Sequence, residues 1–409
     1  MDVPTSFPKD KIKVLLLEGI HPSAIELFAR ETFQVETVKS ALKPEELRER
    51  IADVHLLGIR SKTRVDAASL AAGKKLLALG CFCIGVNQVE LEAANMCGVP
   101  VFNAPFSNTR SVAELVIAEI VVLARQLGDR SREVHEGKWR KVAAQCHEIR
   151  GKALGIVGYG HIGSQVGVLA EAMGMRVNFF DIATKLPMGN NRSQNSLFDL
   201  LGESDFVTLH VPATRETERM IGTKELAAMR KGAHLINASR GSVVDISALA
   251  GAIKNGHIAG AAVDVYPDEP ETNSDGFESE LRNLPNVLLT PHIGGSTEEA
   301  QEAIGREVAT SLIKLTNSGT TAGSVNFPQI DVAPARGTHR ILNVHKNVPG
   351  VLGAVNRIVS DLGANIRAQV LATDRNVGYL VMDLEQDVSS DVAKAMAALS
   401  TNIRTRILY

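Results

Sequence analysis

Short apolar runs alternate with segments of helical spacing along most of the chain. The runs predict buried strands at residues 12–17, 54–59, 76–81, 153–157, 177–181, 206–209, 233–237, 258–263 and 287–289. Apolar residues that recur every three or four positions predict helices at 22–31, 44–51, 111–125, 162–173 and 297–315. Ser107 or Asn108 could cap the helix at 111–125. Strands that alternate with helices in this way are typical of α/β proteins with parallel sheets.

The pattern changes after residue 315. Residues 316–337 are rich in turn-forming residues and lack periodicity, so they predict a linker. Beyond them we expect strands at 340–344, 366–371, 380–384 and 403–408, and helices at 351–362 and 388–399. This βαββαβ order predicts a small ferredoxin-like unit. So small a unit buries a low fraction of its surface alone and would gain from pairing with a copy of itself.

Length and composition indicate a soluble enzyme of two or three domains. The 409 residues are too many for one core, and 44% of them are hydrophobic. A net charge of −2 produces no field that would draw the protein to nucleic acid or to a membrane. Residues 1–10 lack a secretory pattern, and the apolar run at 115–124 is short and carries Glu119. We therefore expect a cytoplasmic protein.

The four cysteines change this picture little. Cys81, Cys83, Cys97 and Cys146 contain no CxxC pair and show no metal-ligand spacing. Reduced structural thiols are the plain interpretation, and no metal site is expected.

A glycine motif follows the predicted strand at 153–157. Gly158 would make the tight turn, Gly160 would let the backbone approach a pyrophosphate, and Gly163 would let helix and strand pack closely. The free N–H groups at the start of the next helix would then meet the phosphates. Asp181, at the end of the following strand, could accept hydrogen bonds from an adenosine ribose. The alternative is a glycine-rich helix start in another α/β protein, but the combination predicts a dinucleotide site.

Catalytic side chains are expected where three later strands end. Arg240 follows one strand, and its planar fork could hold a carboxylate and polarise an adjacent carbonyl, or pair with a nearby acid. His292 follows another strand, and imidazole suits proton transfer during hydride transfer because its pKa lies near neutrality. Glu269 is the best candidate to orient that ring. Other histidines, such as His234 inside a strand, are predicted to be structural.

These features resemble the D-2-hydroxyacid dehydrogenase family. The resemblance rests on the glycine motif with Asp181, on the order Arg240, Glu269, His292, and on the turn Pro291-His-Ile-Gly-Gly. The passages at 80–89 and 102–116, with a C-terminal module similar to an ACT regulatory domain, narrow it to the bacterial ACT-containing D-3-phosphoglycerate dehydrogenases. It runs from about residue 9 to residue 409.

The resemblance implies a Rossmann-like nucleotide domain inserted in a flavodoxin-like substrate domain, followed by an ACT domain. The implied limits are 1–108 for the first part of the substrate domain, 109–295 for the NAD-binding domain, 296–330 for the return segment, 331–338 for a linker and 339–409 for the ACT domain. The pattern of the residues alone does not show that the last helix before the linker returns to the first domain.

The family also implies roles for individual residues. Arg240 would bind the substrate carboxylate and carbonyl, His292 would be the acid/base, and Glu269 would tune it. The implied NAD-binding positions are Gly158, Tyr159, Gly160, His161, Ile162, Gly163, Asp181, His210, Val211, Pro212, Ala238, Ser239, Arg240, Asp264, His292, Gly294 and Gly295.

A phosphorylated substrate needs further cations. By resemblance Arg60 and Ser61 bind the phosphate, with Asn108 and Gln301 nearby, although the basic segment 60–64 could also be a solvated loop. Trp139 and Lys141 resemble residues that reach a neighbouring subunit's site.

The C-terminal module carries an implied effector site. His345, Asn347 and Asn365 match positions that bind L-serine across a paired ACT interface, although they could simply cap turns. Related chains often have Gly-Gly before this module, where this chain has Arg336-Gly337. This difference bears on how strongly serine binding would be coupled to catalysis.

The implied function is therefore NAD-dependent oxidation of D-3-phosphoglycerate, in serine biosynthesis, by a serine-inhibited homotetramer. Two alternatives stay open. One is a dehydrogenase of another small D-2-hydroxy acid, such as 2-hydroxyglutarate, lactate or glyoxylate. The other is a non-enzymatic NAD-responsive scaffold, which the complete set of Arg240, Glu269 and His292 disfavours.

Overall fold

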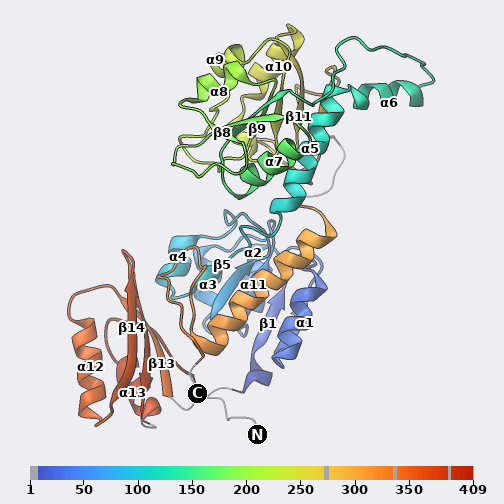
Figure 1. The fold of residues 1–409 in the computed structure, drawn as a ribbon. Helices are drawn as coiled ribbons and strands as arrows, with labels where there is room; N and C mark the ends of the chain where they lie inside the picture. The colour runs from blue at the N-terminus through green and yellow to red at the C-terminus, as the bar shows by residue number, and fades with distance from the viewer. Residues whose placement is uncertain (1–7, 271–275, 335–338, 386–387, 409) are drawn as a thin grey trace. The chain divides into compact units, whose positions relative to one another are not determined.

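The structure is a computed structural model that describes residues 8–270, 276–334, 339–385 and 388–408. Two compact units make up the chain, one of residues 1–107 with 301–409 and the other of residues 108–300. The described strands form three sheets, two in the first unit and one in the second (Figure 1). The division into the five segments 1–108, 109–295, 296–330, 331–338 and 339–409 remains a prediction.

The first sheet of the first unit is parallel, in the order β2-β1-β3-β4-β5. Its strands are β1 (Lys13–Leu16), β2 (Gln34–Thr37), β3 (Leu56–Ile59), β4 (Ala78–Cys81) and β5 (Val101–Phe102). The helices are α1 (Pro22–Arg30), α2 (Pro44–Ile51), α3 (Ala67–Ala72), α4 (Leu91–Met96) and α11 (Glu298–Ser318), with a short 3-10 helix η1 (Lys9–Lys11).

Helix α11 returns to this first sheet. Its residues Val308 and Leu312 join the apolar cluster that covers one face. The approach is close, because a Cβ on Gly80 of β4 would lie 2.6 Å from the Val308 side chain. The return of the last helix, implied by the resemblance, is therefore seen in the packing.

The second unit is a seven-stranded parallel sheet in the order β12-β11-β10-β9-β6-β7-β8. Its strands are β6 (Ala153–Val157), β7 (Arg176–Phe180), β8 (Arg192–Ser193), β9 (Phe206–Leu209), β10 (Ala233–Asn237), β11 (Ile258–Val263) and β12 (Val287–Leu289). The helices are α5 (Thr109–Ala124), α6 (Leu127–His135), α7 (His161–Ala172), α8 (Leu197–Glu203), α9 (Thr223–Ala228) and α10 (Ile246–Lys254), with a 3-10 turn η2 (Gly241–Val243).

The strand order of this second sheet reverses between β6 and β9. One apolar cluster packs α5 and α7 on one face, and another packs α8, α9 and α10 on the other. Ligands of such doubly wound sheets bind outside the carboxyl ends of the strands, at the reversal point. The fold therefore places the glycine motif after β6 where a dinucleotide would bind.

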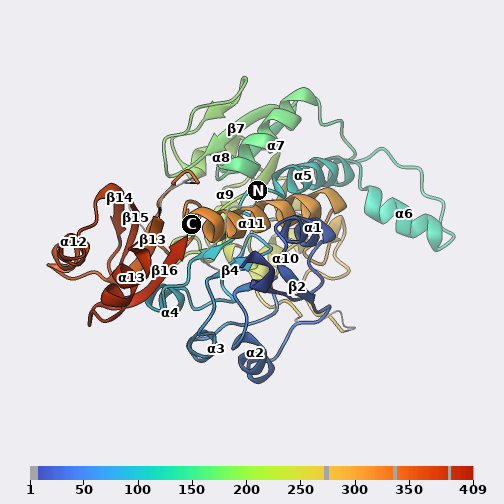
Figure 2. The same cartoon turned by 90° about the horizontal axis from the view of Figure 1, so that it is seen from below.

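The third sheet is antiparallel, in the order β14-β15-β13-β16 (Figure 2). Its elements are β13 (His339–Lys346), α12 (Val351–Asp361), β14 (Ile366–Thr373), β15 (Val377–Leu384), α13 (Ser389–Ala397) and β16 (Asn402–Leu408). Helices α12 and α13 cover one face. The predicted βαββαβ unit is confirmed.

The stretch at 316–337 differs from a simple spacer. Residues 316–318 complete α11, and Phe327 and Ile330 are buried against the second face of the third sheet. Turn-forming residues here make side-chain hydrogen bonds, as from Thr321 Oγ1 to the Pro328 carbonyl at 2.7 Å. The linker prediction is wrong for this packed part. The Arg336-Gly337 hinge lies outside the described residues.

No helix in the described ranges combines the length and the apolar character needed to cross a bilayer.

Candidate active site

The glycine motif forms a tight turn between β6 and α7. Gly158 has φ +88°, and a Cβ there would lie 2.3 Å from the His210 carbonyl oxygen. A Cβ on Gly163 would lie 2.1 Å from the Gly158 carbonyl oxygen, so α7 must pack directly on the turn. By contrast, no heavy atom lies within 4 Å of a Cβ built on Gly160, the residue that caps α7. This open backbone, beside the first N–H groups of a helix, suits a pyrophosphate.

Asp181 follows β7 beside this turn. Its carboxylate accepts hydrogen bonds from the backbone N–H of Tyr159 at 2.8 Å and of Ala183 at 2.9 Å. The two bonds fix the position of the carboxylate next to the glycine turn, as a ribose-binding acid requires.

Two other predicted cofactor residues have structural roles. The Tyr159 ring is buried and stacks on Phe179 with centroids 3.7 Å apart, and its hydroxyl accepts a hydrogen bond from Asn191 Nδ2. Burial lowers the pKa of His210 to about 3, so its imidazole is neutral. Its Nε2 lies 3.0 Å from Thr208 Oγ1.

The remaining predicted cofactor positions lie at strand ends around the reversal point. His161 and Ile162 open α7, Val211 and Pro212 come just after β9, and Ala238 and Ser239 follow β10. The fold thus brings the glycine motif together with the ends of β9 and β10.

Arg240, Glu269 and His292 lie on the loops after β10, β11 and β12. His292 Nδ1 is 2.8 Å from Glu269 Oε2, and Glu269 Oε1 accepts a hydrogen bond from the Tyr266 N–H at 3.0 Å. Arg240 Nη1 donates to the Ser239 carbonyl at 2.6 Å. The imidazole is therefore oriented by a carboxylate that is itself held in place.

The contact between His292 and Glu269 changes the pKa of both side chains. The hydrogen bond to Glu269 raises the pKa of His292, although burial and the positive charge of Arg240 act in the opposite direction. Burial alone would raise the pKa of Glu269, but the hydrogen bonds from His292 and Tyr266 outweigh it and lower the pKa. The arrangement favours imidazolium facing carboxylate. The charge of Arg240 also acts on both groups, lowering the pKa of Glu269 and opposing the rise at His292.

Asp264 holds the turn that carries His292. The carboxylate is 1% exposed and accepts hydrogen bonds from Thr290 Oγ1 at 2.6 Å and from the N–H groups of Ile293 and Gly294, each at 2.8 Å. These bonds surround His292, whose φ of +53° is rare for a residue with a side chain. The sequence predicted Asp264 as a cofactor residue and missed this positioning role, for which an acid directly after a buried strand was the only signal.

Replacing Glu269 by glutamine is expected to move the pH profile. Loss of the carboxylate lowers the pKa of His292, since the hydrogen bond that raises it becomes weaker. Carbonyl reduction needs imidazolium, so its rate should fall away at lower pH than in the unmodified enzyme. Oxidation needs neutral imidazole and should begin at lower pH. Rates of both directions across pH 5–10 test this.

Glu278→Gln is the matched control, because Glu278 is an exposed acid of the same unit that pairs with Arg282. Superimposable profiles for Glu269→Gln and the control would contradict the role of Glu269.

The predicted phosphate residues belong to the first unit. The Glu18 carboxylate accepts hydrogen bonds from the N–H groups of Arg60, Lys62 and Thr63, at 2.8 to 3.2 Å. The basic segment is therefore a fixed loop after β3, and Ser61 is exposed on it. Glu18 has φ +63°, and no motif of the sequence marks it.

The other predicted substrate residues are spread over both units. Asn108 caps α5 in the second unit and lies against Gly295, where a Cβ would meet its Nδ2 at 2.5 Å. It forms no side-chain capping bond. Lys141 is exposed on the loop before β6, near Trp139, which is 87% exposed. Gln301 lies on α11.

The predicted effector residues differ in their surroundings. Asn347 and Asn365 are exposed, and their side chains donate to the Asp374 carbonyl and to Glu385 Oε2. The predicted strand end at residue 344, which leaves His345 outside the strand, is wrong. His345 lies inside β13, because that strand stays paired with β15 as far as Lys346, and it is 4% exposed. Burial lowers its pKa, and Nδ1 pairs with Asn343 Oδ1 at 2.9 Å.

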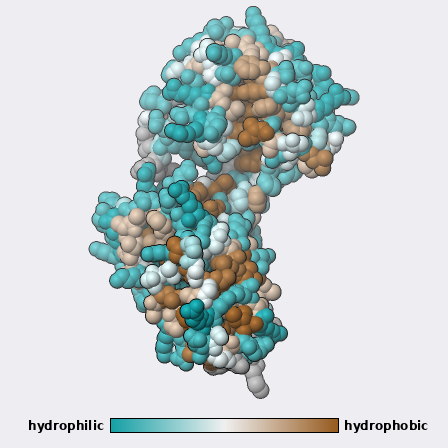
Figure 3. Space-filling view, turned by 90° about the vertical axis from the view of Figure 1, so that its left-hand side faces the viewer, coloured by the Kyte–Doolittle hydropathy of each residue, from teal (hydrophilic) through white to brown (hydrophobic). Residues whose placement is uncertain are grey.

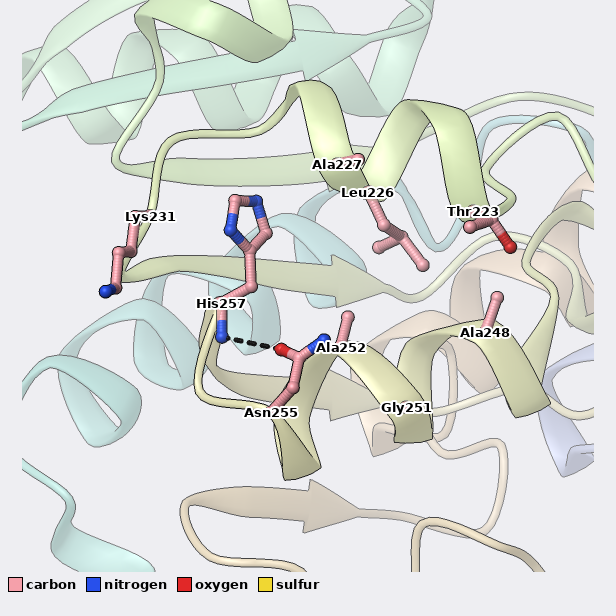
Figure 4. Close-up of a pocket in the computed structure, with 9 residues that line it drawn as sticks. All are labelled: Thr223, Leu226, Ala227, Lys231, Ala248, Gly251, Ala252, Asn255 and His257. Carbon is pink, nitrogen blue, oxygen red and sulfur yellow. Dashed lines mark hydrogen bonds between the residues drawn. The ribbon is translucent and has the colours of Figure 1, made fainter.

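A cavity of about 600 Å³ lies away from these residues, between α9 and α10 (Figure 4). Small side chains line much of it, with Lys231 and His257 at the edge. The His257 backbone N–H donates to Asn255 Oδ1, and the His257 Nε2 lies 3.0 Å from the Met229 carbonyl oxygen. The cavity contains none of the predicted catalytic or cofactor residues. In the described ranges no three His, Cys, Asp or Glu side chains cluster in a way that could hold a metal.

Full-length similarity decides the family. The chain is 56% identical over 409 residues to D-3-phosphoglycerate dehydrogenase of Dictyostelium discoideum, with 100% of both chains covered. It is 53% identical to D-3-phosphoglycerate dehydrogenase of Escherichia coli K12, with 99% of both chains covered. This chain belongs to the D-3-phosphoglycerate dehydrogenases. A relative from Saccharomyces cerevisiae, D-3-phosphoglycerate dehydrogenase 1, is 53% identical over 98% of this chain and 89% of its own.

Domain families and solved structures support the same assignment. Residues 117–294 match the D-isomer specific 2-hydroxyacid dehydrogenase NAD-binding domain, and residues 341–404 match an AHAS small subunit-like ACT domain. The crystal structure of the TT0316 protein from Thermus thermophilus is similar over 77% of this chain and 100% of its own, at 31% identity and a TM-score of 0.70. An NAD-complexed D-isomer specific 2-hydroxyacid dehydrogenase from Lactobacillus delbrueckii covers 77% of this chain and 100% of its own, at 25% identity and a TM-score of 0.68.

As a D-3-phosphoglycerate dehydrogenase, this chain is an NAD-dependent oxidoreductase. The predicted fold class is confirmed.

Proposed function

We propose that this chain oxidises D-3-phosphoglycerate to 3-phosphohydroxypyruvate with NAD, in the route to serine. The observation that carries the proposal is the 2.8 Å pair of His292 and Glu269 near the charge of Arg240, in the same unit as the glycine turn. Relatives named D-3-phosphoglycerate dehydrogenase support the substrate. We place the reaction in the cytoplasm, where the thiols of Cys81, Cys83, Cys97 and Cys146, which form no disulfide, would stay reduced.

Each residue of the site has its own role in the proposed reaction. Bound NAD supplies a hydride acceptor, held by the glycine turn and Asp181. Arg240 binds the substrate carboxylate and polarises the carbonyl oxygen that forms. His292 takes the hydroxyl proton as the hydride leaves the same carbon, and it returns that proton in the reverse direction. Glu269 stabilises the imidazolium, and Asp264 keeps the turn of His292 in place.

The substrate phosphate would meet Arg60 and Ser61, and Asn108, Gln301 and, from a neighbouring subunit, Lys141 are the other proposed substrate residues. The loop held by Glu18 supports this role, since a preformed loop loses little entropy on binding. The test is steady-state reduction of phosphohydroxypyruvate, hydroxypyruvate, pyruvate and glyoxylate with NADH. Phosphohydroxypyruvate should have the highest kcat/KM by at least an order of magnitude. Faster turnover of an unphosphorylated acid would assign the chain to the alternative substrate class.

We expect NADH to be preferred to NADPH. A 2′-phosphate would meet the fixed Asp181 carboxylate, and residues 182–185 contain no arginine that could neutralise it. A preference of at least tenfold in kcat/KM corresponds to about 1.4 kcal/mol. Asp181→Asn should reduce the preference for NADH over NADPH. Asp199→Asn is the control, because Asp199 is an exposed acid on α8 that accepts a hydrogen bond from Ser196. Equal or better kcat/KM with NADPH would contradict this role of Asp181.

The proposal includes a homotetramer and inhibition by L-serine bound to His345, Asn347 and Asn365 between paired C-terminal modules. Strand β14 is an edge strand with exposed apolar side chains, Val370 at 42% and Leu371 at 37%. Such an edge suits pairing with another copy. Apolar patches also interrupt the polar surface on the face shown in Figure 3. Serine would hold two modules in one orientation and slow turnover more than it weakens substrate binding.

Asn347→Ala is expected to abolish serine inhibition and leave uninhibited kcat almost unchanged. The side chain lies in the C-terminal module, where it would bind the polar end of the amino acid, and its exposed hydrogen bond to the Asp374 carbonyl is a small loss for the fold. The measurement is the initial rate against serine concentration. Lys394→Ala, an exposed residue of α13, should remain inhibited. Failure of serine to bind the unmodified protein in calorimetry would reassign the module to another ligand or to assembly.

A further inference from the structure

A second cavity, of about 430 Å³, lies in the first unit between the α3–β4 segment and β16. Its described lining consists of Leu70, Ala71, Lys74, Lys75, Leu77, Cys97, Ile403, Arg404, Thr405 and Arg406. Four of these side chains are basic, and no acidic side chain is among them. None of the ten has a role in the proposed reaction, so the cavity is separate from the active site.

The two arginines lie on one face of β16. Arg404 and Arg406 are two residues apart in a strand, so their side chains point the same way. Arg404 Nη1 donates to the Leu76 carbonyl, and Arg406 Nη2 is 3.5 Å from the Thr316 carbonyl. Both acceptors are neutral. Figure 2 shows β16 beside α4, and the Arg404 Cδ lies 3.3 Å from a Cβ built on Gly98, just after that helix.

These guanidinium groups are partly buried, and no countercharge faces them among the described residues. Burial lowers the pKa of both Arg404 and Arg406, which shows the cost of keeping their charge there. Across the described ranges no carboxylate forms an ion pair with Arg404, Arg406 or Lys74. A buried charge is normally paired, since an unpaired one loses its hydration without compensation.

The neighbouring charges do not supply the missing anion. Lys75 pairs with Asp53, but that carboxylate also pairs with Lys13. Burial, followed by the charge of Lys75, lowers the pKa of nearby His55, and an imidazole is either neutral or positive, so it adds no negative charge. Among the described residues, the cavity therefore has an excess of positive charge.

We propose that this cavity binds a small phosphate-bearing anion, at a site distinct from the one proposed for the substrate phosphate. Arginine forks and lysine ammonium groups are the side chains that recognise phosphate oxygens. The volume suits a small phosphorylated metabolite or an inorganic polyphosphate. One wall comes from α3 and the segment that leads into β4 of the first sheet, and the other comes from β16 of the C-terminal module. A bound anion therefore links the two sheets of this unit and stabilises their contact.

The test is calorimetry of the full-length protein with inorganic pyrophosphate and, separately, with ribose 5-phosphate. Lys74→Glu places a negative charge at an exposed position of the rim and should weaken binding at least tenfold. Lys394→Glu makes the same charge change on exposed α13 and should leave binding unchanged. Arg60→Ala should also retain it, because Arg60 serves the proposed substrate site. Raising NaCl from 50 to 200 mM should weaken binding in the unmodified protein.

The two ligands distinguish the source of the phosphate. Binding of either one with the stated response to Lys74→Glu supports the proposal, and the tighter of the two shows whether an inorganic or an organic phosphate is preferred. Binding that is equal in Lys74→Glu, or that disappears in Arg60→Ala, overturns it, as does binding of neither ligand. Arg406→Gln provides a second variant, in which pyrophosphate should no longer raise Tm. This outcome is independent of whether phosphohydroxypyruvate is the substrate.

Discussion

Replacing His292 by alanine is expected to lower kcat by roughly 10²- to 10⁴-fold in both directions, the usual range for a lost general acid–base. The imidazole is paired with Glu269 at 2.8 Å, and its pKa is raised by that bond, so it can donate a proton near neutral pH. The glycine turn and Asp181 are separate from it, so NADH affinity should change little. Steady-state reduction of phosphohydroxypyruvate and fluorescence titration of NADH provide the two measurements.

His257→Ala is the matched control for this prediction. His257 is a histidine of the same unit, at the cavity of Figure 4, and it contacts the Met229 carbonyl. It should keep nearly full turnover. A His292→Ala enzyme with kcat within a few-fold of the unmodified enzyme would remove His292 from the acid–base role, whereas lost turnover with lost NADH binding would indicate a damaged fold.

The sequence predicted those parts of the fold that depend on local pattern. The run at 153–157 is apolar at every position because β6 is buried on both faces, and Gly163 is required by a contact only a few residues away. The strand ends that carry Arg240, Glu269 and His292 could also be predicted, because polar residues follow apolar runs there. Local periodicity and turn chemistry were sufficient in these places.

Features that depend on distant contacts could not be predicted in the same way. The two buried oxygens of Asp264 serve residues 26 to 30 positions later. Glu18 fixes a loop more than 40 residues away. His345 continues β13 only because Gly378 of β15 lies opposite, where a Cβ would meet its imidazole at 2.3 Å. A polar residue close to a predicted turn gives no sign of such a partner.

The incorrect prediction of a linker at residues 316–337 has the same cause. Residues such as Thr320 and Thr321 indicate turns when they are read alone. In the structure their hydroxyls bond to carbonyls in residues 328–332, and Phe327 packs against Tyr379 of the third sheet. Tertiary burial therefore overrides a turn-rich composition that lacks any period.

Gly241→Ala is expected to reduce kcat/KM by roughly 10²-fold, the order reached when catalytic groups are displaced by about 1 Å. Gly241 follows Arg240, and a Cβ there would lie 1.9 Å from the Tyr266 carbonyl carbon and 2.1 Å from its oxygen. Backbone cannot give way as a flexible side chain would, so the loop of Arg240 must move away from the loop of Glu269. Overpacking of this kind also costs roughly 1–3 kcal/mol of stability.

The measurements for Gly241→Ala are kcat, KM and Tm, with Gly251→Ala as the matched control. Gly251 lies within α10, where no atom is within 4 Å of the added Cβ, and alanine is favoured over glycine inside helices by up to about 1 kcal/mol. That variant should keep full activity and an equal or higher Tm. Because Gly241 packs on Tyr266, we expect it to set the spacing between Arg240, proposed to bind the substrate carboxylate, and the proposed acid–base pair. A folded Gly241→Ala enzyme with unchanged kcat/KM would show that this spacing does not control the reaction.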